Sequence, residues 1–195
     1  MDELKIAIAL FDGVEELDFA GPYEVLTAWA RQSERPITVR SVGPSAVEPV
    51  TASHGLRMIP DVGWDELGEV DLFVLPGGNM TAVRGDEAFV ERMRTLAGSG
   101  VTMTSVCTGA LVYADAGLLA GRRATTHWGS LDRLAEFDGV TVDADARYVD
   151  EGEVVTAAGV SAGIDMALHL VARFESVERA QAVRRYIQYD PAPPV

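Results

Sequence analysis

Four short strand-like runs restrict the possible folds of this chain more than any other feature. They are LKIAIALF (Leu4 to Phe11), PITVRSV (Pro36 to Val42), VDLFVL (Val70 to Leu75) and VTMTSV (Val101 to Val106). A nearly continuous apolar run of this length is typical of a strand buried on both faces of a parallel sheet. The pattern therefore predicts a core of parallel strands.

Helical stretches separate these runs. The spacing of apolar residues predicts helices from Gly21-Pro22 to about Arg31, from 86 to 96, from 110 to 116, from 163 to 174 with Ser161 as N-cap, and a last helix to about Tyr189. The remaining segments are predicted as a short strand at 56–59 and a hairpin at 147–157 around Glu151-Gly152. Alternating strands and helices predict an α/β fold with helices on both faces of a mostly parallel sheet. Without a linker or a repeat, residues 1–195 read as a single domain.

Composition and charge exclude several classes of protein. The 195 residues are 48% hydrophobic and 24% charged, which is ordinary for a folded soluble chain and unlike a disordered one or a coiled coil. A net charge of -14 repels phosphate backbones and anionic lipids, so nucleic acid and membranes are poor partners. No apolar run is long enough to span a bilayer, and the first residues lack the basic region of a secretory signal, so we expect a cytoplasmic protein.

Cys107 is the strongest candidate for chemistry. It stands directly between the run Val101 to Val106 and the expected helix, so a sharp turn would raise its sulfur above the sheet edge as in a nucleophile elbow. Gly109 would allow close passage of the chain, and a helix N-terminus favours a thiolate, so we expect a thiol more acidic than usual. The alternative is a cysteine that packs as a small buried hydrophobe.

Residues near the same sheet edge could assist the thiol. Gly77 and Gly78 follow the run Val70 to Leu75 and could turn N–H groups toward an oxyanion, although such glycines also mark ordinary turns. Asp18, between the first strand and its helix, could hydrogen-bond the sulfur or simply cap the helix. Of the three histidines, only His127 stays a marginal site candidate.

The sequence lacks the motifs of common metal and nucleotide cofactor sites. A single cysteine, three histidines and no Cys-x-x-C form no recognisable zinc site, so we expect no metal. The chain contains neither GxGxxG nor GxxxxGK[ST], which removes the usual case for a dinucleotide or a nucleoside triphosphate. We therefore expect no cofactor.

The stretch TSVCTGALVYADAGLLAGRRATTHW, from Thr104 to Trp128, resembles the cysteine region of the ThiJ/PfpI superfamily, whose members are related to class I glutamine amidotransferases. Further similar segments are LDFAGPYEV (17–25), LPGG (75–78), AGVSAGIDMA (158–167) and IQYDP (187–191), so the resemblance covers nearly the whole chain. The resemblance implies a flavodoxin-like sandwich, a reactive cysteine and an acidic partner on the first strand-to-helix connection. In this sequence these residues are Cys107 and Asp18.

Within the superfamily the chain is most similar to the isonitrile hydratase branch and to the related amidase-like domains of AraC-type regulators. The peptidase and glyoxalase branches usually have glutamate at the acidic position, and the peptidase branch has histidine after the cysteine, whereas this chain has Asp18 and Thr108. The resemblance thus implies a lyase that hydrates a small isonitrile to an N-formamide. The Cys107 thiolate would attack the terminal carbon, Asp18 would act as general acid and then base, and N–H groups of Gly78 and Thr108 would hold an oxyanion.

Two other functions remain open at this point. A glyoxalase or deglycase would use the same thiol on small carbonyl compounds. A stand-alone sensor would use Cys107 for redox or ligand sensing. The resemblance also implies a homodimer, and the Pro-rich tail at 190–195 has no evident core to join.

Overall fold

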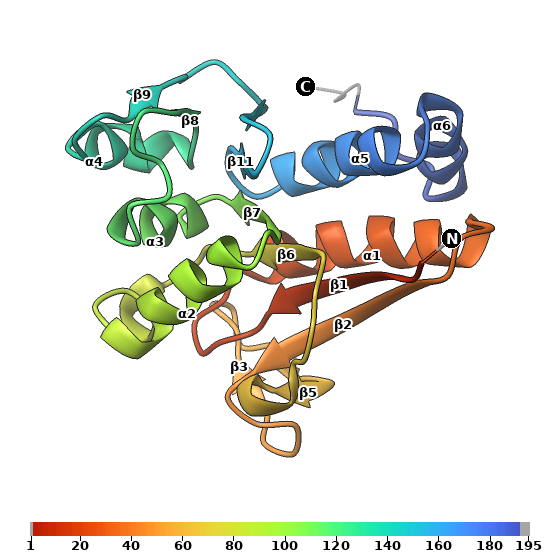
Figure 1. Ribbon diagram of the computed structural model, residues 1–195, viewed down its shortest axis with the longest axis horizontal. Helices are drawn as coiled ribbons and strands as arrows, with labels where there is room; N and C mark the ends of the chain where they lie inside the picture. The colour runs from red at the N-terminus through yellow and green to blue at the C-terminus, as the bar shows by residue number, and fades with distance from the viewer. Residues whose placement is uncertain (1, 192–195) are drawn as a thin grey trace.

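The computed structural model describes residues 2–191, which form a seven-stranded sheet with helices on both faces (Figure 1). The strand order is β10-β11-β7-β6-β1-β2-β5, and every pairing is parallel except that of β10 with β11. The bounds are β1 Leu4–Ala9, β2 Ile37–Gly43, β5 Val62–Gly63, β6 Leu72–Leu75, β7 Thr102–Val106, β10 Tyr148–Asp150 and β11 Val154–Ala157. The expected α/β class and mostly parallel sheet are confirmed.

Five of the six described helices form two groups. Helices α1, α5 and α6 pack against one another on one face, while α2 and α3 pack together on the other (Figure 1). The helix bounds are α1 Glu16–Gln32, α2 Glu87–Gly98, α3 Gly109–Asp115, α4 Leu131–Ala135, α5 Ala162–Phe174 and α6 Val177–Tyr186. Among the described residues no helix is both long and apolar enough to cross a membrane.

Short elements lie outside the main sheet. Two small sheets pair β3 (Val50–Thr51) with β4 (Arg57–Met58), and β8 (Arg123–Ala124) with β9 (Thr141–Val142). The strand expected at 56–59 is thus β4, outside the main sheet. Residues 2–191 also contain three 3-10 turns, namely η1 Trp64–Glu66, η2 Met80–Ala82 and η3 Trp128–Ser130.

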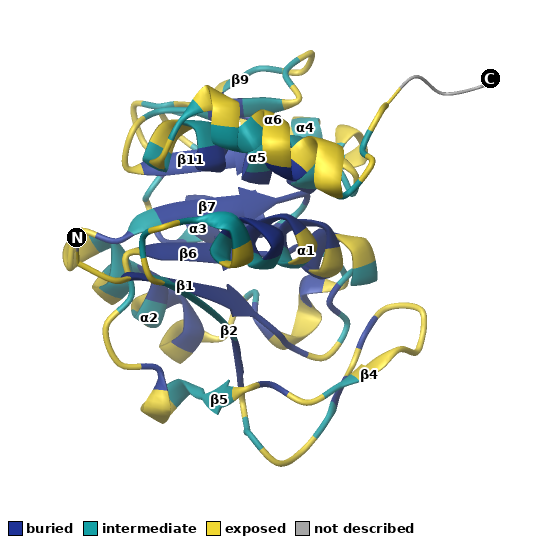
Figure 2. Ribbon diagram, turned by 90° about the vertical axis from the view of Figure 1, so that its right-hand side faces the viewer, coloured by how far each residue is buried: buried dark blue, intermediate teal, exposed yellow. Residues whose placement is uncertain are grey.

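The core lies along the central strands, as the dark ribbons of Figure 2 show. All residues of β6 and β11 are buried, and α1 and α2 contribute the large buried side chains Trp29 and Met93 to the same core. Each fully buried side chain of this size contributes roughly 1.5–3 kcal/mol relative to an exposed one. The strands that carry the candidate residues are therefore firmly held.

The first helix begins earlier than its sequence indicates. It starts at Glu16 rather than at Gly21-Pro22, so Pro22 lies inside the helix and Asp18 in its first turn. Pro22 cannot donate a hydrogen bond to the residue four positions earlier. Its ring lies against α5, where a Cβ at Gly163 would be 3.1 Å from the proline Cγ.

Two other helix ends also differ from expectation. Ser161 precedes α5 but makes no side-chain cap bond, and its Oγ instead accepts a hydrogen bond from Arg147 at 3.2 Å. Helix α6 ends at Tyr186, short of Tyr189, and Gln188 adopts a φ of 50°. The expected hairpin is present as β10 and β11. The tail lies outside the described residues from position 192 onward.

Candidate active site

Three parallel strands deliver the candidate residues to one edge of the sheet. Strands β2 and β6 flank β1 on opposite sides, so the connections from β1 and β6 leave in opposite directions. Ligands bind at such switch points in open α/β sheets. Asp18 follows β1, Gly77 and Gly78 follow β6, and Cys107 and Thr108 follow β7. The structure brings all five sequence-derived site residues together there.

Cys107 lies in a sharp turn between β7 and α3. Its φ is 55°, in the left-handed region that non-glycine residues rarely occupy. Its N–H is 3.0 Å from the carbonyl oxygen of Ala158, and its own carbonyl accepts the Thr126 hydroxyl at 2.7 Å. A Cβ on Gly109 would lie only 2.4 Å from the carbonyl oxygen of Leu75, so the turn requires glycine there. The strand-to-helix elbow is therefore held from both sides.

Asp18 is completely buried in the first turn of α1. Its Oδ2 accepts the Gly77 N–H at 2.9 Å, and Oδ1 has no hydrogen-bond partner among the described residues. Burial raises the pKa of Asp18 to about 7, with Glu15 adding repulsion, while the Gly77 N–H and the Cys107 thiol lower it in part. A carboxyl group with this pKa can take up and release a proton near neutrality.

The protonation of Cys107 differs from the sequence-based expectation. The side chain is only 6% exposed. Burial, and secondly the negative charge of Asp18, raise the pKa of Cys107 to about 12, although N–H groups of Thr108 and Val160 and the Thr108 hydroxyl lower it in part. The expectation of an unusually acidic thiol is thus wrong for this state, because the start of the short helix α3 stabilises the thiolate less than burial and Asp18 destabilise it.

The backbone amides of the glycine pair are already engaged. The Gly77 N–H binds Asp18, and the Gly78 N–H binds the Thr108 hydroxyl at 3.0 Å. A Cβ on Gly77 would be 2.6 Å from the Thr108 nitrogen and 2.9 Å from Asp18 Oδ2, so glycine is required for this close approach. The glycines therefore orient Asp18 and Thr108, and an oxyanion role for Gly78 would require it to exchange its partner.

Val160 is a site residue that the sequence did not reveal. Its N–H interacts with the Cys107 sulfur, and its φ of 46° is rare for a β-branched side chain. No local signal in AGVSAG predicts this conformation, because a β-branched residue rarely adopts a positive φ. The only available hint was the position of Val160 just after β11.

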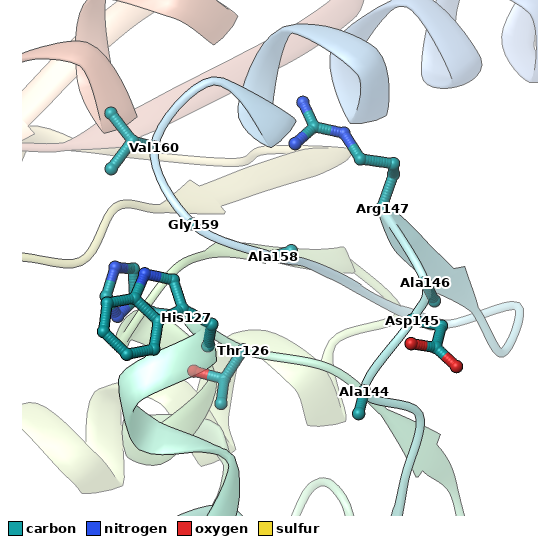
Figure 3. A pocket seen from close by; sticks show the side chains of 10 residues that line it. Thr126, His127, Ala144, Asp145, Ala146, Arg147, Ala158, Gly159 and Val160 are labelled. Carbon is teal, nitrogen blue, oxygen red and sulfur yellow. The ribbon is translucent and has the colours of Figure 1, made fainter.

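A hollow of about 330 Å³ lies next to the elbow, because Thr126 and Ala158, which line it, hydrogen-bond the backbone of Cys107. Thr126 and His127 form one wall, the segment 158–160 runs through the middle, and the segment 144–147 lies opposite (Figure 3). Trp128 completes the lining. Two of these segments also bond to Cys107, through Thr126 and Ala158.

The three histidines have different surroundings. His127 lines the hollow, and its Nδ1 accepts the Gly129 N–H at 3.2 Å, so Nε2 carries the proton in the neutral ring. His169 pairs with Asp150 at 2.7 Å, outside the site. His54 lies 3.4 Å from Glu15, beside the start of α1. Only His127 lines the hollow beside Cys107.

One group of side chains has the composition of a metal site. Ligand atoms of Glu15, Glu16 and His54 lie within 4.8 Å of one another. The carboxylate of Glu16 already accepts the backbone N–H of His54 at 2.8 Å and that of Leu56 at 3.5 Å. These contacts give the group a structural role, fixing the turn at 53–56 against α1.

Comparisons with known proteins agree on one family. The profile of the DJ-1/PfpI family matches residues 4–173. An isonitrile hydratase of Pseudomonas putida is 38% identical over 192 residues, covering 98% of this chain and 81% of that enzyme. The HTH-type transcriptional regulator CdhR of Pseudomonas aeruginosa is 35% identical over 136 residues, or 69% of this chain, but these cover only 40% of the regulator.

Solved structures support the same assignment. A ThiJ/PfpI family protein from Pseudomonas syringae superposes with a TM-score of 0.89 at 30% identity, covering 100% of this chain and 78% of that one. DJ-1beta of Drosophila melanogaster superposes with a TM-score of 0.86 at 21% identity, covering 97% of this chain and 100% of that one. The second likeness concerns the fold alone.

Proposed function

The chain belongs to the DJ-1/PfpI family, and on that premise we propose that it is an isonitrile hydratase, which adds water to an organic isonitrile to give the N-formamide. The observation that carries the proposal is the buried Asp18 carboxyl beside the Cys107 thiol, with a pKa of about 7. The reaction needs a nucleophile and a group that moves protons in both directions. This pair meets both needs without a cofactor.

The first half of the reaction forms a bond between sulfur and carbon. Cys107 starts as a thiol, since its pKa is about 12. As Sγ attacks the terminal carbon of R–N≡C, the Asp18 carboxylate takes the thiol proton and delivers it to that carbon. The product is the thioimidate R–N=CH–S–Cys, and Asp18 is again ionised.

The second half adds water and releases the product. Asp18 takes a proton from a water molecule while the water oxygen adds to the same carbon. Asp18 then passes that proton to the nitrogen, giving R–NH–CH(OH)–S–Cys. The C–S bond then breaks as C=O forms, and the hydroxyl proton returns to sulfur through Asp18. One isonitrile and one water yield one N-formamide, with the thiol restored.

Two variants test this function. Asp18→Asn keeps the shape and can accept the Gly77 N–H but transfers no proton, so turnover should fall by roughly 10²–10⁴, the usual worth of a general acid or base. Cys107→Ala should abolish turnover, because no thioimidate can form. The measurement is formamide production from an aliphatic isonitrile, with thermal melts of all three proteins as the folding control. A wild type without turnover contradicts the proposal, and full activity in Asp18→Asn contradicts the role of the carboxyl group.

The test also distinguishes the other functions. A glyoxalase would consume methylglyoxal rather than the isonitrile. A ligand sensor, which similarity to the regulator CdhR favours, would bind without turnover. A redox sensor needs an exposed, acidic thiol, and the burial and raised pKa of Cys107 weigh against it.

A further inference from the structure

Trp128 is an exposed aromatic residue at the hollow beside the elbow. It is 80% exposed, whereas large apolar side chains are usually covered. Its backbone is nevertheless well held, because the 3-10 turn η3 is capped by the side chain of His127, which accepts the Gly129 N–H, and by a bond of 2.7 Å from the Ser130 N–H to the His127 carbonyl. The backbone that carries the indole is therefore held in place, while the indole ring itself is exposed to solvent.

The neighbouring histidine is fixed as well. A Cβ on Gly159 would lie 2.4 Å from the His127 Cδ2, so the imidazole lies directly against the glycine backbone. The rings of His127 and Trp128 are 5.2 Å apart at a tilt of 40°. Together they form an aromatic wall on one side of the hollow.

The hollow is connected to the nucleophile through shared residues. Three of its ten lining residues bond to Cys107, namely Thr126 to its carbonyl, Ala158 to its N–H and Val160 to its sulfur. A group bound in the hollow therefore lies against the same backbone that holds the thiol. At about 330 Å³ the volume is at the lower end for small-molecule sites and suits a single ring.

We propose that this hollow, which we term the Trp128 hollow, binds the organic substituent of the substrate and selects a flat aromatic ring without negative charge. The inference rests on the proposed hydratase function and names its substrate class. A planar aromatic ring can stack on the indole of Trp128. A saturated ring of the same size stacks less well because it is not flat.

The charges around the hollow support the proposed exclusion of negatively charged substituents. The guanidinium of Arg147 is engaged, because its Nε donates to Asp165 at 2.8 Å and its Nη2 donates to Ser161 at 3.2 Å. Asp145 also lines the hollow, and it forms no ion pair among residues 2–191. With a chain charge of -14, an anionic substituent would be repelled.

Kinetics with three isonitriles tests the proposal. Phenyl and cyclohexyl isonitrile differ in planarity at equal ring size, and 4-isocyanobenzoate adds a negative charge. We expect the lowest KM for phenyl isonitrile. Trp128→Ala should raise that KM roughly 3- to 10-fold, with little change for cyclohexyl isonitrile or in kcat, and Trp128→Phe should restore most of the loss. Tyr186→Ala is the matched control, since Tyr186 is an exposed aromatic residue on α6, away from the hollow.

Direct binding separates this inference from the proposed function. In Cys107→Ala, N-phenylformamide should quench tryptophan fluorescence more strongly than N-cyclohexylformamide, and Trp128→Phe should remove the difference. The other tryptophans interfere little, because Trp29 is buried and Trp64 packs against Phe73 and Phe89.

Each outcome has a defined meaning. Trp128-dependent binding without turnover of any isonitrile would refute the hydratase but keep the aromatic site. Turnover with equal KM values for the two uncharged isonitriles, unchanged in Trp128→Ala, would overturn the inference. A change of molecular mass in Trp128→Ala by light scattering would also overturn it, because Trp128 would then be covered by a second copy of the chain.

Discussion

At the scale of single residues, Cys107 and Asp18 share one buried space, so the charge of each determines the proton affinity of the other. The pKa of Asp18 is about 7 and that of Cys107 about 12, so Asp18 loses its proton first as the pH rises. Above neutrality the pair therefore consists of a carboxylate and a thiol. In this state Asp18 is the base that a neutral nucleophile needs.

The same coupling predicts how the thiol responds to loss of the carboxylate. Because the negative charge of Asp18 raises the pKa of Cys107, Asp18→Asn should lower that pKa toward the ordinary value of about 8.5. Burial remains, so the pKa should stay above the ordinary value. The measurement is the rate of alkylation by iodoacetamide as the pH is raised from neutrality, with Cys107→Ala as the blank. A midpoint unchanged or higher in Asp18→Asn would contradict the coupling.

At the scale of elements, the elbow between β7 and α3 depends on a third segment. Thr125 and Thr126, which follow β8, are both buried, but only Thr126 uses its hydroxyl to bind the elbow, at the Cys107 carbonyl. The Thr125 Oγ1 has no partner among the described residues. Thr125 and Thr126 are therefore a matched pair for substitution, because only the Thr126 hydroxyl has a hydrogen bond to lose.

Substituting these two threonines tests the elbow directly. Thr126→Val leaves the Cys107 carbonyl with only a weak bond from the Ala110 N–H at 3.4 Å, so the free energy of unfolding should fall by about 1–3 kcal/mol. Thr125→Val removes an unpaired hydroxyl and should leave stability unchanged or higher. Thr126→Ser should restore most of the loss. The measurement is urea unfolding, and equal effects of the two valine variants would show that the Thr126 bond is unimportant.

Sequence patterns located most elements, because each buried strand is a short apolar run bounded by turn residues. They failed where tertiary contacts decide the structure. The start of α1 at Glu16 could not be inferred, since proline is disfavoured inside a helix and Pro22 therefore indicates a helix start rather than an interior position. The left-handed backbone of Val160 likewise has no local sequence signal, because β-branched residues rarely adopt a positive φ. The family resemblance pointed to Asp18 and Cys107, but the pKa of the thiol depended on burial, which a sequence does not display.

At the scale of the whole molecule, topology determines where chemistry is possible. The strand order places the ends of β1, β6 and β7 side by side, and the residues after each strand form the site. Segments more than 80 residues apart in sequence, such as those holding Asp18 and Cys107, meet there for this reason. The position of the site followed from the alternation of strands and helices, whereas the hollow did not, because β8, η3 and β9 have weak sequence signals.

The overall charge bears on the expected homodimer, which the family resemblance implies. Two copies that each carry a charge of -14 repel one another, and salt screens this repulsion over about 10 Å at 0.1 M. Exposed apolar side chains, among them Leu56 and Ile59 at 52% and 57% exposure, would stabilise association when covered. We therefore expect a symmetric dimer whose dissociation constant falls as salt is added, the reverse of an assembly held by ion pairs.

Light scattering and sedimentation across micromolar concentrations, at low and at physiological ionic strength, provide the measurement. A dimer mass at physiological salt, with more monomer at low salt, is the expected result. A monomer mass under both conditions would rule out the dimer, and dissociation on adding salt would show that ion pairs rather than apolar surfaces hold it. Cys107→Ala should associate as the wild type does, because its side chain is buried within one copy and takes no part in holding two together.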